Sequence, residues 1–153
     1  MSGERFTLDT NILVYGVDAR DLRKHELALD ILRAAVGLDC PLALQAIGEF
    51  YVAATGKVKL RAKDARTRAL QLMRSFDTFA HSANAVRAGL EESAAGRFSF
   101  WDSVLLASAA EAGCSIILSE DMRDGARLGS IVVANPFAGS GLSAAARDVL
   151  GQA

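Results

Sequence analysis

Four acidic residues in this sequence stand where their side chains could share one site: Asp9, Glu49, Asp102 and Asp121. Asp9 directly follows the apolar run Phe6–Leu8, and Asp121 follows the run Ile116–Ser119 by two residues. Four carboxylates in one crevice repel one another unless a cation compensates their charge, and hard oxygen ligands select Mg²⁺ or Mn²⁺. Such a cation activates water for attack on phosphorus and neutralises the phosphate. If the four side chains do share one crevice, they could hold a divalent cation there.

Each acid by itself also has an ordinary structural explanation. Asp9 could cap the next helix, and Asp121 could begin a turn. Asp102 stands three residues after Ser99, which is the spacing of a capping box. The helix that carries Glu49 has its core face at Ile47, Phe50, Tyr51 and Ala54. Glu49 points nearly opposite to that face, so it is a ligand only if its helix crosses the crevice.

The elements that must position these acids alternate between strands and helices. Apolar runs predict strands at Phe6–Leu8, Pro41–Leu44, Phe79–His81, Ser115–Ser119 and Ile131–Ala134. Helical spacing predicts helices at about 22–36, 47–56, 62–76, 82–96 and 100–112, the last of them buried. The apolar stripes of the third and fourth helices include Met73 and Leu90. This alternation implies a three-layer α/β fold with a mainly parallel sheet of four to five strands. In such sheets ligands bind beyond the carboxyl ends of the strands.

Length and composition favour one globular domain, since the 153 residues are 51% hydrophobic and 23% charged. The formal net charge of -1 argues against a protein that grips nucleic acid by bulk charge. Any nucleic-acid activity must therefore rest on local features. The clearest is the basic run Lys57–Arg68, which is either a solvated loop and helix face or a contact for substrate or partner.

Cysteine content and hydropathy bear on the compartment. Cys40 and Cys114 are too few for a disulfide framework and lack zinc-site spacing, so we expect thiol-independent chemistry. The first residues do not form a basic and then apolar leader, and no segment approaches the ~18 apolar residues of a membrane helix. We therefore expect a cytoplasmic protein without membrane attachment.

Two further side chains near the acids have alternative interpretations. Trp101, at the head of an apolar helix, is expected to be buried in the core or an interface in preference to stacking on a base. Lys24 is either a phosphate contact or a solvated lysine. His25 and His81 are far apart in the sequence, so we expect neither to be a catalyst.

Four motifs occur in the order and spacing of a known family: Leu8–Leu13 (LDTNIL), Glu49–Phe50, Phe98–Ser103 (FSFWDS) and Leu118–Met122 (LSEDM). With this combination the chain resembles the PIN-domain ribonucleases, and most closely the toxin subunits of VapBC-type toxin-antitoxin pairs. The likeness implies a nuclease domain at 1–138. The Gly- and Ser-rich tail at 139–153 lies outside it and offers a short helix at 143–150, either loose or docked.

The resemblance implies a divalent-metal-dependent endoribonuclease that leaves a 5′-phosphate and a 3′-hydroxyl. Its site for Mg²⁺ or Mn²⁺ would consist of Asp9, Glu49, Asp102 and Asp121. Asn11 and Ser119 would give nearby polar support. The family's pattern selects Asp121 over its acidic neighbours Glu120 and Asp124. The implied partners are an RNA substrate, a second copy in a homodimer, and a cognate antitoxin that presents an Arg to the carboxylates.

Other functions are compatible with parts of this pattern. A haloacid-dehalogenase-like phosphatase needs a second Asp where the chain has Asn11, and a receiver domain needs a Lys where it has Asn135-Pro136. A PIN-like scaffold that binds RNA or a partner without cutting is disfavoured by the intact set of acids. A PIN nuclease that processes RNA, in place of a toxin, remains as the alternative.

Overall fold

The computed structural model describes residues 3–152, and a four-stranded sheet lies at its centre. Its strands in spatial order are β1 (Phe6–Leu8), β4 (Ile116–Leu118), β6 (Ile131–Ala134) and β5 (Arg127–Leu128). The first three are parallel, while β5 runs antiparallel to β6. This confirms the expected α/β fold with a mainly parallel sheet. The sequence does not predict β5, because two residues are too few to show an alternating pattern.

Two short strand pairs flank this sheet. The parallel pair β2 (Leu42–Ala43) and β3 (Thr78–Phe79) corresponds to the second and third predicted strands, although β3 begins one residue earlier and ends before His81. The β2 segment stays close to β1, because the Thr7 hydroxyl donates to the Pro41 carbonyl at 2.6 Å. The strands β7 (Phe137–Ala138) and β8 (Gly141–Leu142) form an antiparallel hairpin.

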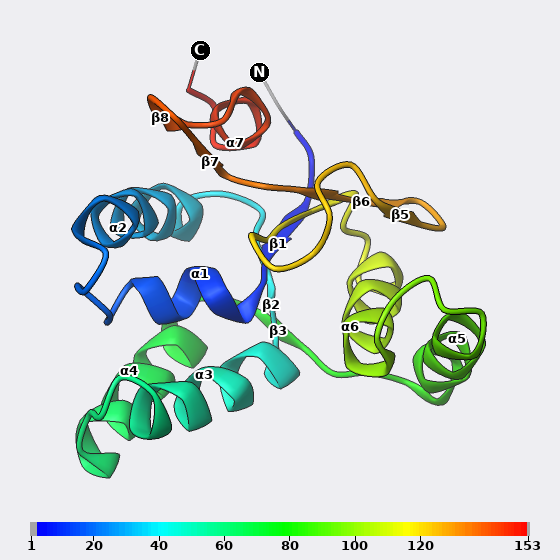
Figure 1. Cartoon of the computed structure of the whole chain (residues 1–153), viewed down its shortest axis with the longest axis horizontal. Coiled ribbons are helices and arrows are strands. Elements are labelled where there is room, and N and C mark those ends of the chain that lie inside the picture. The colour runs from blue at the N-terminus through cyan, green and yellow to red at the C-terminus, as the bar shows by residue number, and fades with distance from the viewer. Residues whose placement is uncertain (1–2, 153) are drawn as a thin grey trace.

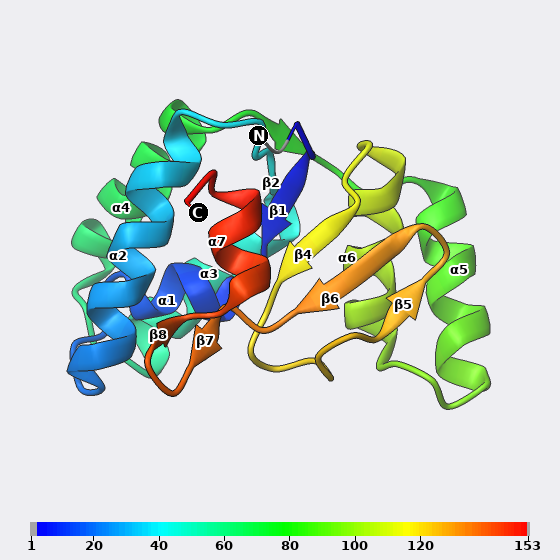
Figure 2. The same cartoon turned by 90° about the horizontal axis from the view of Figure 1, so that it is seen from above.

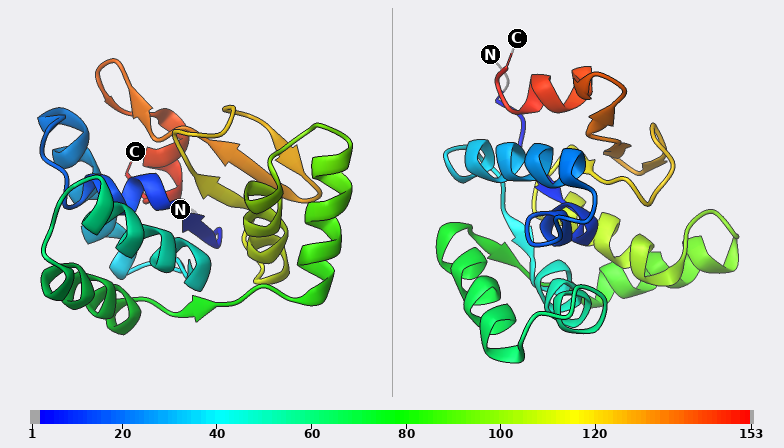
Figure 3. Two further views of the ribbon diagram at one scale, coloured as in Figure 1. Left: turned by 60° about the horizontal axis from the view of Figure 1, so that its bottom comes forward. Right: turned by 60° about the vertical axis from the view of Figure 1, so that its left-hand side comes forward.

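Helices cover both faces of the sheet. Within the described residues they are α1 (Thr10–Tyr15), α2 (Leu22–Val36), α3 (Leu44–Gly56), α4 (Ala62–Ser75), α5 (Ala83–Ala94), α6 (Phe100–Glu111) and α7 (Ala144–Val149). Figure 1 shows α7 on one side of the sheet and α5 with α6 on the other. Figure 3 shows α3 and α4 lying side by side. The predicted helices are confirmed, but α1 was missed because six residues are too few for a helical period.

Local chemistry sets the helix ends, while burial departs from the periodic pattern at several positions. Ser82, Ser99 and Ser143 each cap a helix by accepting a backbone N–H. The middle of α6 is buried as expected, from Ser103 to Ala109. The predicted core positions Tyr51, Met73 and Leu90 are exposed instead. Periodicity gives the angular position of a residue on its helix but not the extent of the neighbour that covers it.

The C-terminal tail is docked on the domain. Leu142, Ala146, Val149 and Leu150 are buried in the same hydrophobic core as the central strands. Figure 2 shows α7 lying beside β1, at the edge of the sheet. The tail therefore contributes to the core, and the division between residues 1–138 and 139–153 stays a prediction. None of the described helices is long and apolar enough to cross a membrane.

Candidate active site

The parallel pairing of β1 and β4 places Asp9 beside Ser119. Leu8 and Leu118 are register partners, and the next residue of each strand begins the site. The Asp9 N–H donates to the Leu118 carbonyl at 2.9 Å, which keeps the two chains together past the strand ends. The Ser119 hydroxyl then donates to Asp9 Oδ2 at 2.7 Å. The carboxyl edge of the sheet thus holds a buried, hydrogen-bonded carboxylate.

Helix α1 completes the support of Asp9. Asp9 is its N-cap, and Oδ1 accepts from the Thr10 N–H at 2.7 Å. The Asn11 amide donates to Asp9 Oδ2 at 3.2 Å, and Asn11 Oδ1 accepts from the Glu120 N–H at 3.1 Å. Asn11 therefore joins α1 to the segment after β4. Asp9 therefore both caps α1 and belongs to the site.

The other three acids line the same cavity as Asp9, which has a volume of about 270 Å³. Asp102 comes from the first turn of α6, where its N–H donates to the capping Ser99 hydroxyl at 3.2 Å. Glu49 comes from α3, and the Gln45 amide donates both to Glu49 Oε1 at 2.9 Å and to the Trp101 carbonyl at 3.1 Å. Helix α3 therefore does run along the crevice, tied to the head of α6.

Burial and neighbouring charge raise the pKa of Asp9 to about 6. The main cause is loss of solvent around the carboxylate, and the negative charges of Asp102 and Asp121 act in the same direction. The hydrogen bonds from Ser119 and from the Thr10 N–H oppose this rise. A carboxylate in these surroundings gains most from a nearby cation.

The donor atoms in this cavity suit a hard divalent cation, since they are carboxylate oxygens. Among residues 3–152, no three His, Cys, Asp or Glu side chains stand close enough together to hold a metal ion as they are. Glu49 and Asp121 are exposed and can turn, and Mg²⁺ usually keeps several waters while binding only one or two carboxylates. The cavity therefore fits a hydrated cation without being a preformed cage.

Comparison with a family model places this geometry in a known context. The model of the PIN domain matches residues 6–127, which is most of the chain. The chain belongs to the PIN domain family. PIN domains are nucleases, and the carboxylate-lined cavity lies at the edge of the sheet where ligands bind in parallel α/β folds.

Solved structures share the fold of this PIN domain. Mycobacterium tuberculosis VapC20, a sarcin-ricin loop cleaving toxin, is 18% identical with a TM-score of 0.62, over 76% of this chain and 91% of that one. The toxin-antitoxin complex from Klebsiella pneumoniae is 20% identical with a TM-score of 0.59, over 86% of this chain and 97% of that one. DNA-bound VapBC from Salmonella typhimurium is 14% identical with a TM-score of 0.63, over 85% of this chain and 96% of that one. A comparison with curated proteins finds no match.

The acids next to Asp121 in this PIN domain have other partners. Glu120 accepts from the Tyr15 hydroxyl at 2.6 Å and forms an ion pair with Lys24. Asp124 Oδ1 accepts from the Asn135 N–H at 2.9 Å. Lys24 is therefore engaged by Glu120 in place of being simply solvated, and its role as a phosphate contact stays a prediction. Burial and the bond to Glu120 raise the pKa of Tyr15 to about 12, so it stays a donor.

Asp18 and Lys57 also line the cavity, and of the two only Lys57 was singled out from the sequence. Asp18 is buried and accepts two hydrogen bonds from the Arg20 side chain, at 2.9 and 2.8 Å. These bonds hold the pKa of Asp18 at about 2. The sequence offers no signal for Asp18, whereas Lys57 begins the basic run. Further along that run, Arg61 pairs with Asp64 at 2.8 Å on the surface, as in the solvated interpretation.

Trp101 is not buried in the core, and its burial in an interface stays a prediction. Its side chain is 55% exposed and packs edge-on against Phe100, with ring centroids 4.9 Å apart. The buried face of α6 begins only at Ser103, so the first turn carries Trp101 outward. Trp101 borders a surface hollow that it shares with Glu49 and Val52 of α3.

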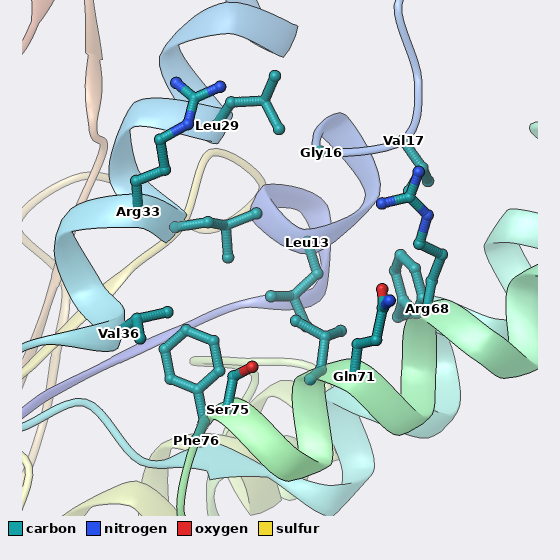
Figure 4. Close-up of a pocket in the computed structure, with 13 residues that line it drawn as sticks. Leu13, Gly16, Val17, Leu29, Arg33, Val36, Arg68, Gln71, Ser75 and Phe76 are labelled. Atoms are coloured by element: carbon teal, nitrogen blue, oxygen red, sulfur yellow. The ribbon is translucent and has the colours of Figure 1, made fainter.

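An apolar cleft lies on the opposite side of α1 from the acids. Figure 4 shows side chains of α1, α2 and α4 that point into it, with Leu13, Leu29 and Val36 among them and Arg68 at its edge. Its volume is about 230 Å³. Helix α1 is the shared wall, because Leu13 faces the cleft while Asn11 faces the acids.

Proposed function

We propose that this PIN domain is a divalent-metal-dependent endoribonuclease that uses Mg²⁺ or Mn²⁺. Its metal-binding and catalytic residues would be Asp9, Glu49, Asp102 and Asp121, supported by Asn11 and Ser119. The observation that carries the proposal is the convergence of these four carboxylates on one cavity from four separate segments. Asp18 and Glu120 also line the cavity, but Arg20 and Lys24 compensate their charges. Three of the four are close enough to interact, since Asp102 and Asp121 raise the pKa of Asp9. Such repulsion persists in a fold when a cation normally relieves it.

In the proposed mechanism, each residue has a role that follows from its contacts. Ser119 and Asn11 orient Asp9 through hydrogen bonds to Oδ2. Asp102 and Glu49 reach the cavity from α6 and α3, and Lys57 adds a cation at the end of α3. When bound, Mg²⁺ or Mn²⁺ supplies Lewis-acid activation of a water molecule and of the phosphate. The Lys57 ammonium suits a phosphate oxygen of the substrate.

The test is cleavage of structured and single-stranded RNA by the purified chain with Mg²⁺, with Mn²⁺ and with chelator. We expect metal-dependent cleavage and a loss of more than about 100-fold for Asp9→Asn, because second-shell changes at metal sites already cost 10- to 100-fold. Asp148→Asn, an exposed position on α7, is the matched control and should cleave normally. Cleavage in chelator, or undiminished cleavage by Asp9→Asn, contradicts the mechanism.

We infer further that the enzyme is the toxin of a type II toxin-antitoxin pair and acts on RNA in the cytoplasm. Two kinds of support exist: structural neighbours that are toxin-antitoxin complexes, and an apolar cleft suited to a partner helix. The partner chain could continue from the cleft past α1 and present an Arg to the carboxylates.

Coexpression with the product of a neighbouring small reading frame tests this role. Leu29→Asp puts a charge into the cleft and should abolish inhibition by that product while RNA cleavage persists. Leu22→Asp, on the exposed start of the same helix α2, is the control and should remain inhibited. Cleavage that the neighbouring product never inhibits would favour an RNA-processing PIN nuclease.

We also propose a homodimer, with a second copy covering the hollow beside Trp101. Val52 and Trp101 are 68% and 55% exposed there, and Leu44 on the same helix as Val52 is also exposed. Large apolar side chains that gather on one surface mark interaction sites. Because Glu49 borders this hollow as well as the acidic cavity, the two sites of a dimer would lie near its interface.

A further inference from the structure

A second groove opens beside the acidic cavity and shares Asp102 with it. Its volume is about 530 Å³. The lining includes three arginines and the beginning of α6: Arg97, Phe98, Ser99, Arg123 and Arg127. The groove is thus basic on the side away from the acids, although the chain as a whole has a net charge of -1. This contrast makes it a candidate binding surface for an anion.

The two arginines on the sheet side stand on a firmly held segment. Arg123 lies next to Met122, which is buried and whose N–H donates to the Ser119 hydroxyl at 3.4 Å. Arg127 lies on β5, between buried Ala126 and half-buried Leu128. Its register partner is Val132 of β6. Both guanidinium groups therefore project from backbone fixed by the same sheet that carries Asp9.

The three arginines of the groove differ in whether their charge is free to bind an anion. Arg97 donates two hydrogen bonds to the Glu92 carboxylate, at 2.6 and 3.1 Å, so its charge is already compensated. Arg123 and Arg127 are exposed, and neither has an ion-pair partner among residues 3–152. The amino end of α6 opens on the same groove at Ser99 and adds partial positive charge.

We propose that Arg123 and Arg127 bind a backbone phosphate of the RNA strand next to the phosphate that is cut. This inference rests on the proposed ribonuclease function and adds the path of the substrate. The shared residue Asp102 makes the groove continuous with the acidic cavity, so one strand can occupy both. Arginine forks suit phosphate oxygens. An acidic segment of a partner protein is the competing occupant, but the apolar cleft lies elsewhere, beyond α1.

The test measures RNA binding without cleavage, in the Asp9→Asn background with constant Mg²⁺. Fluorescence anisotropy of a labelled single-stranded RNA of mixed sequence is followed over a series of KCl concentrations. We expect Arg123→Gln with Arg127→Gln to weaken binding and to reduce the slope of log K against log salt by about 0.7, since the contact to one phosphate is lost and each phosphate contact contributes ~0.7. The matched control, Arg74→Gln with Arg87→Gln, removes the same charge from exposed positions on α4 and α5.

Cleavage kinetics of the same pairs, made with Asp9 intact, separate the two proposals. The double variant of Arg123 and Arg127 (the groove pair) should have a higher KM at nearly unchanged kcat, while the control double variant (the control pair) keeps the KM of the parent. This result supports the groove as a substrate contact. If the two pairs have equal RNA affinity, equal salt slopes and equal KM while the parent cleaves RNA, the proposed phosphate contact in the groove is overturned. A groove pair that binds and cleaves RNA normally but escapes inhibition by the partner protein also overturns it, in favour of an acidic protein segment. If the parent cleaves no RNA, the ribonuclease proposal itself fails.

Discussion

At the scale of single residues, Asp9 combines two demands that conflict in the metal-free protein. It caps α1 and accepts hydrogen bonds from Thr10, Asn11 and Ser119, which favours the ionised form. Burial and two neighbouring carboxylates disfavour that form more strongly, since the pKa is raised from 3.8 to about 6. The folded protein therefore binds a proton at pH values where the unfolded chain has lost it.

This pKa shift predicts a pH-dependent gain in stability for Asp9→Asn. Between pH 3.8 and about 6 the contribution of Asp9 to the unfolding free energy of the metal-free parent falls as pH rises, by up to about 3 kcal/mol. Asp9→Asn removes this titration, so it should be more stable than the parent above about pH 6, with the difference vanishing below pH 3.8. Urea denaturation in the presence of chelator over this pH range measures the difference in unfolding free energy. A parent that is as stable as Asp9→Asn at neutral pH contradicts the prediction.

Ser119→Ala tests how Asp9 is positioned. The Ser119 hydroxyl lowers the pKa of Asp9 and accepts from the N–H groups of Asp121 and Met122. Its loss should cost about 1–3 kcal/mol of stability and move the acid limb of the cleavage profile to higher pH, because the metal requires ionised Asp9. Ser108→Ala, a buried hydroxyl on α6, is the control and should leave the profile in place.

At the scale of elements, the packing of α5 on α6 holds Asp102 in place. Gly89 of α5 lies against the stiff side chain of Val104 on α6, so that a Cβ at Gly89 would come within 2.7 Å of Val104 Cγ2. The ring of Phe100 lies 3.1 Å from the same point. The missing Cβ lets the two helices approach closely beside the turn that carries Asp102.

A pair of glycine substitutions separates packing from helix propensity. Gly89→Ala should lower the unfolding free energy, since overpacking typically costs about 1–3 kcal/mol and the helix gain is only about 1 kcal/mol. Gly48→Ala in α3 meets nothing within 4 Å and should raise stability by up to about 1 kcal/mol. Thermal unfolding compares them, and equal shifts of the same sign would show that α5 is free to move away from α6.

The docked tail gives a second prediction at this scale. Leu150 is buried in the main core, so Leu150→Ala should lower stability by roughly 2–5 kcal/mol. Asp148→Ala, at an exposed position two residues earlier, should change it by less than about 0.5 kcal/mol. Chemical denaturation distinguishes them. A negligible effect of Leu150→Ala would mean that α7 is dispensable to the fold.

At the scale of the whole molecule, function is divided among surfaces that share residues with the acidic cavity. Glu49 borders both the cavity and the hollow at Trp101, while Asp102 borders both the cavity and the basic groove. The apolar cleft lies behind α1. Substrate, second copy and inhibitory partner therefore have separate places in the proposal, each adjacent to the same four carboxylates or to the helix that supports them.

The proposed dimer predicts a specific response to a surface charge. Val52→Asp should convert the protein to a monomer in sedimentation equilibrium, because a charge would be buried between two apolar faces. Leu70→Asp, at a similarly exposed apolar position on α4, is the control and should leave the oligomeric state unchanged. A parent that is monomeric at all concentrations, or a dimer unaffected by Val52→Asp, would contradict this interface.

The sequence by itself determined the α/β class, the order of the main elements and the family, because apolar periodicity and short motifs are local properties. The tertiary structure decided how the acids named by the family motifs come together and in what surroundings. Glu49 looks like a solvated residue on its own helix, and only the tie from Gln45 to the head of α6 places α3 along the crevice. Asp18 carried no signal at all. The same limit explains Trp101, because periodicity does not show where a covering neighbour ends. Local chemistry gave each of the four acids a cap, a turn or an exposed face. The parallel register of β1 with β4 brought Asp9 next to the segment of Asp121, and helices α3 and α6 brought Glu49 and Asp102 to the same cavity.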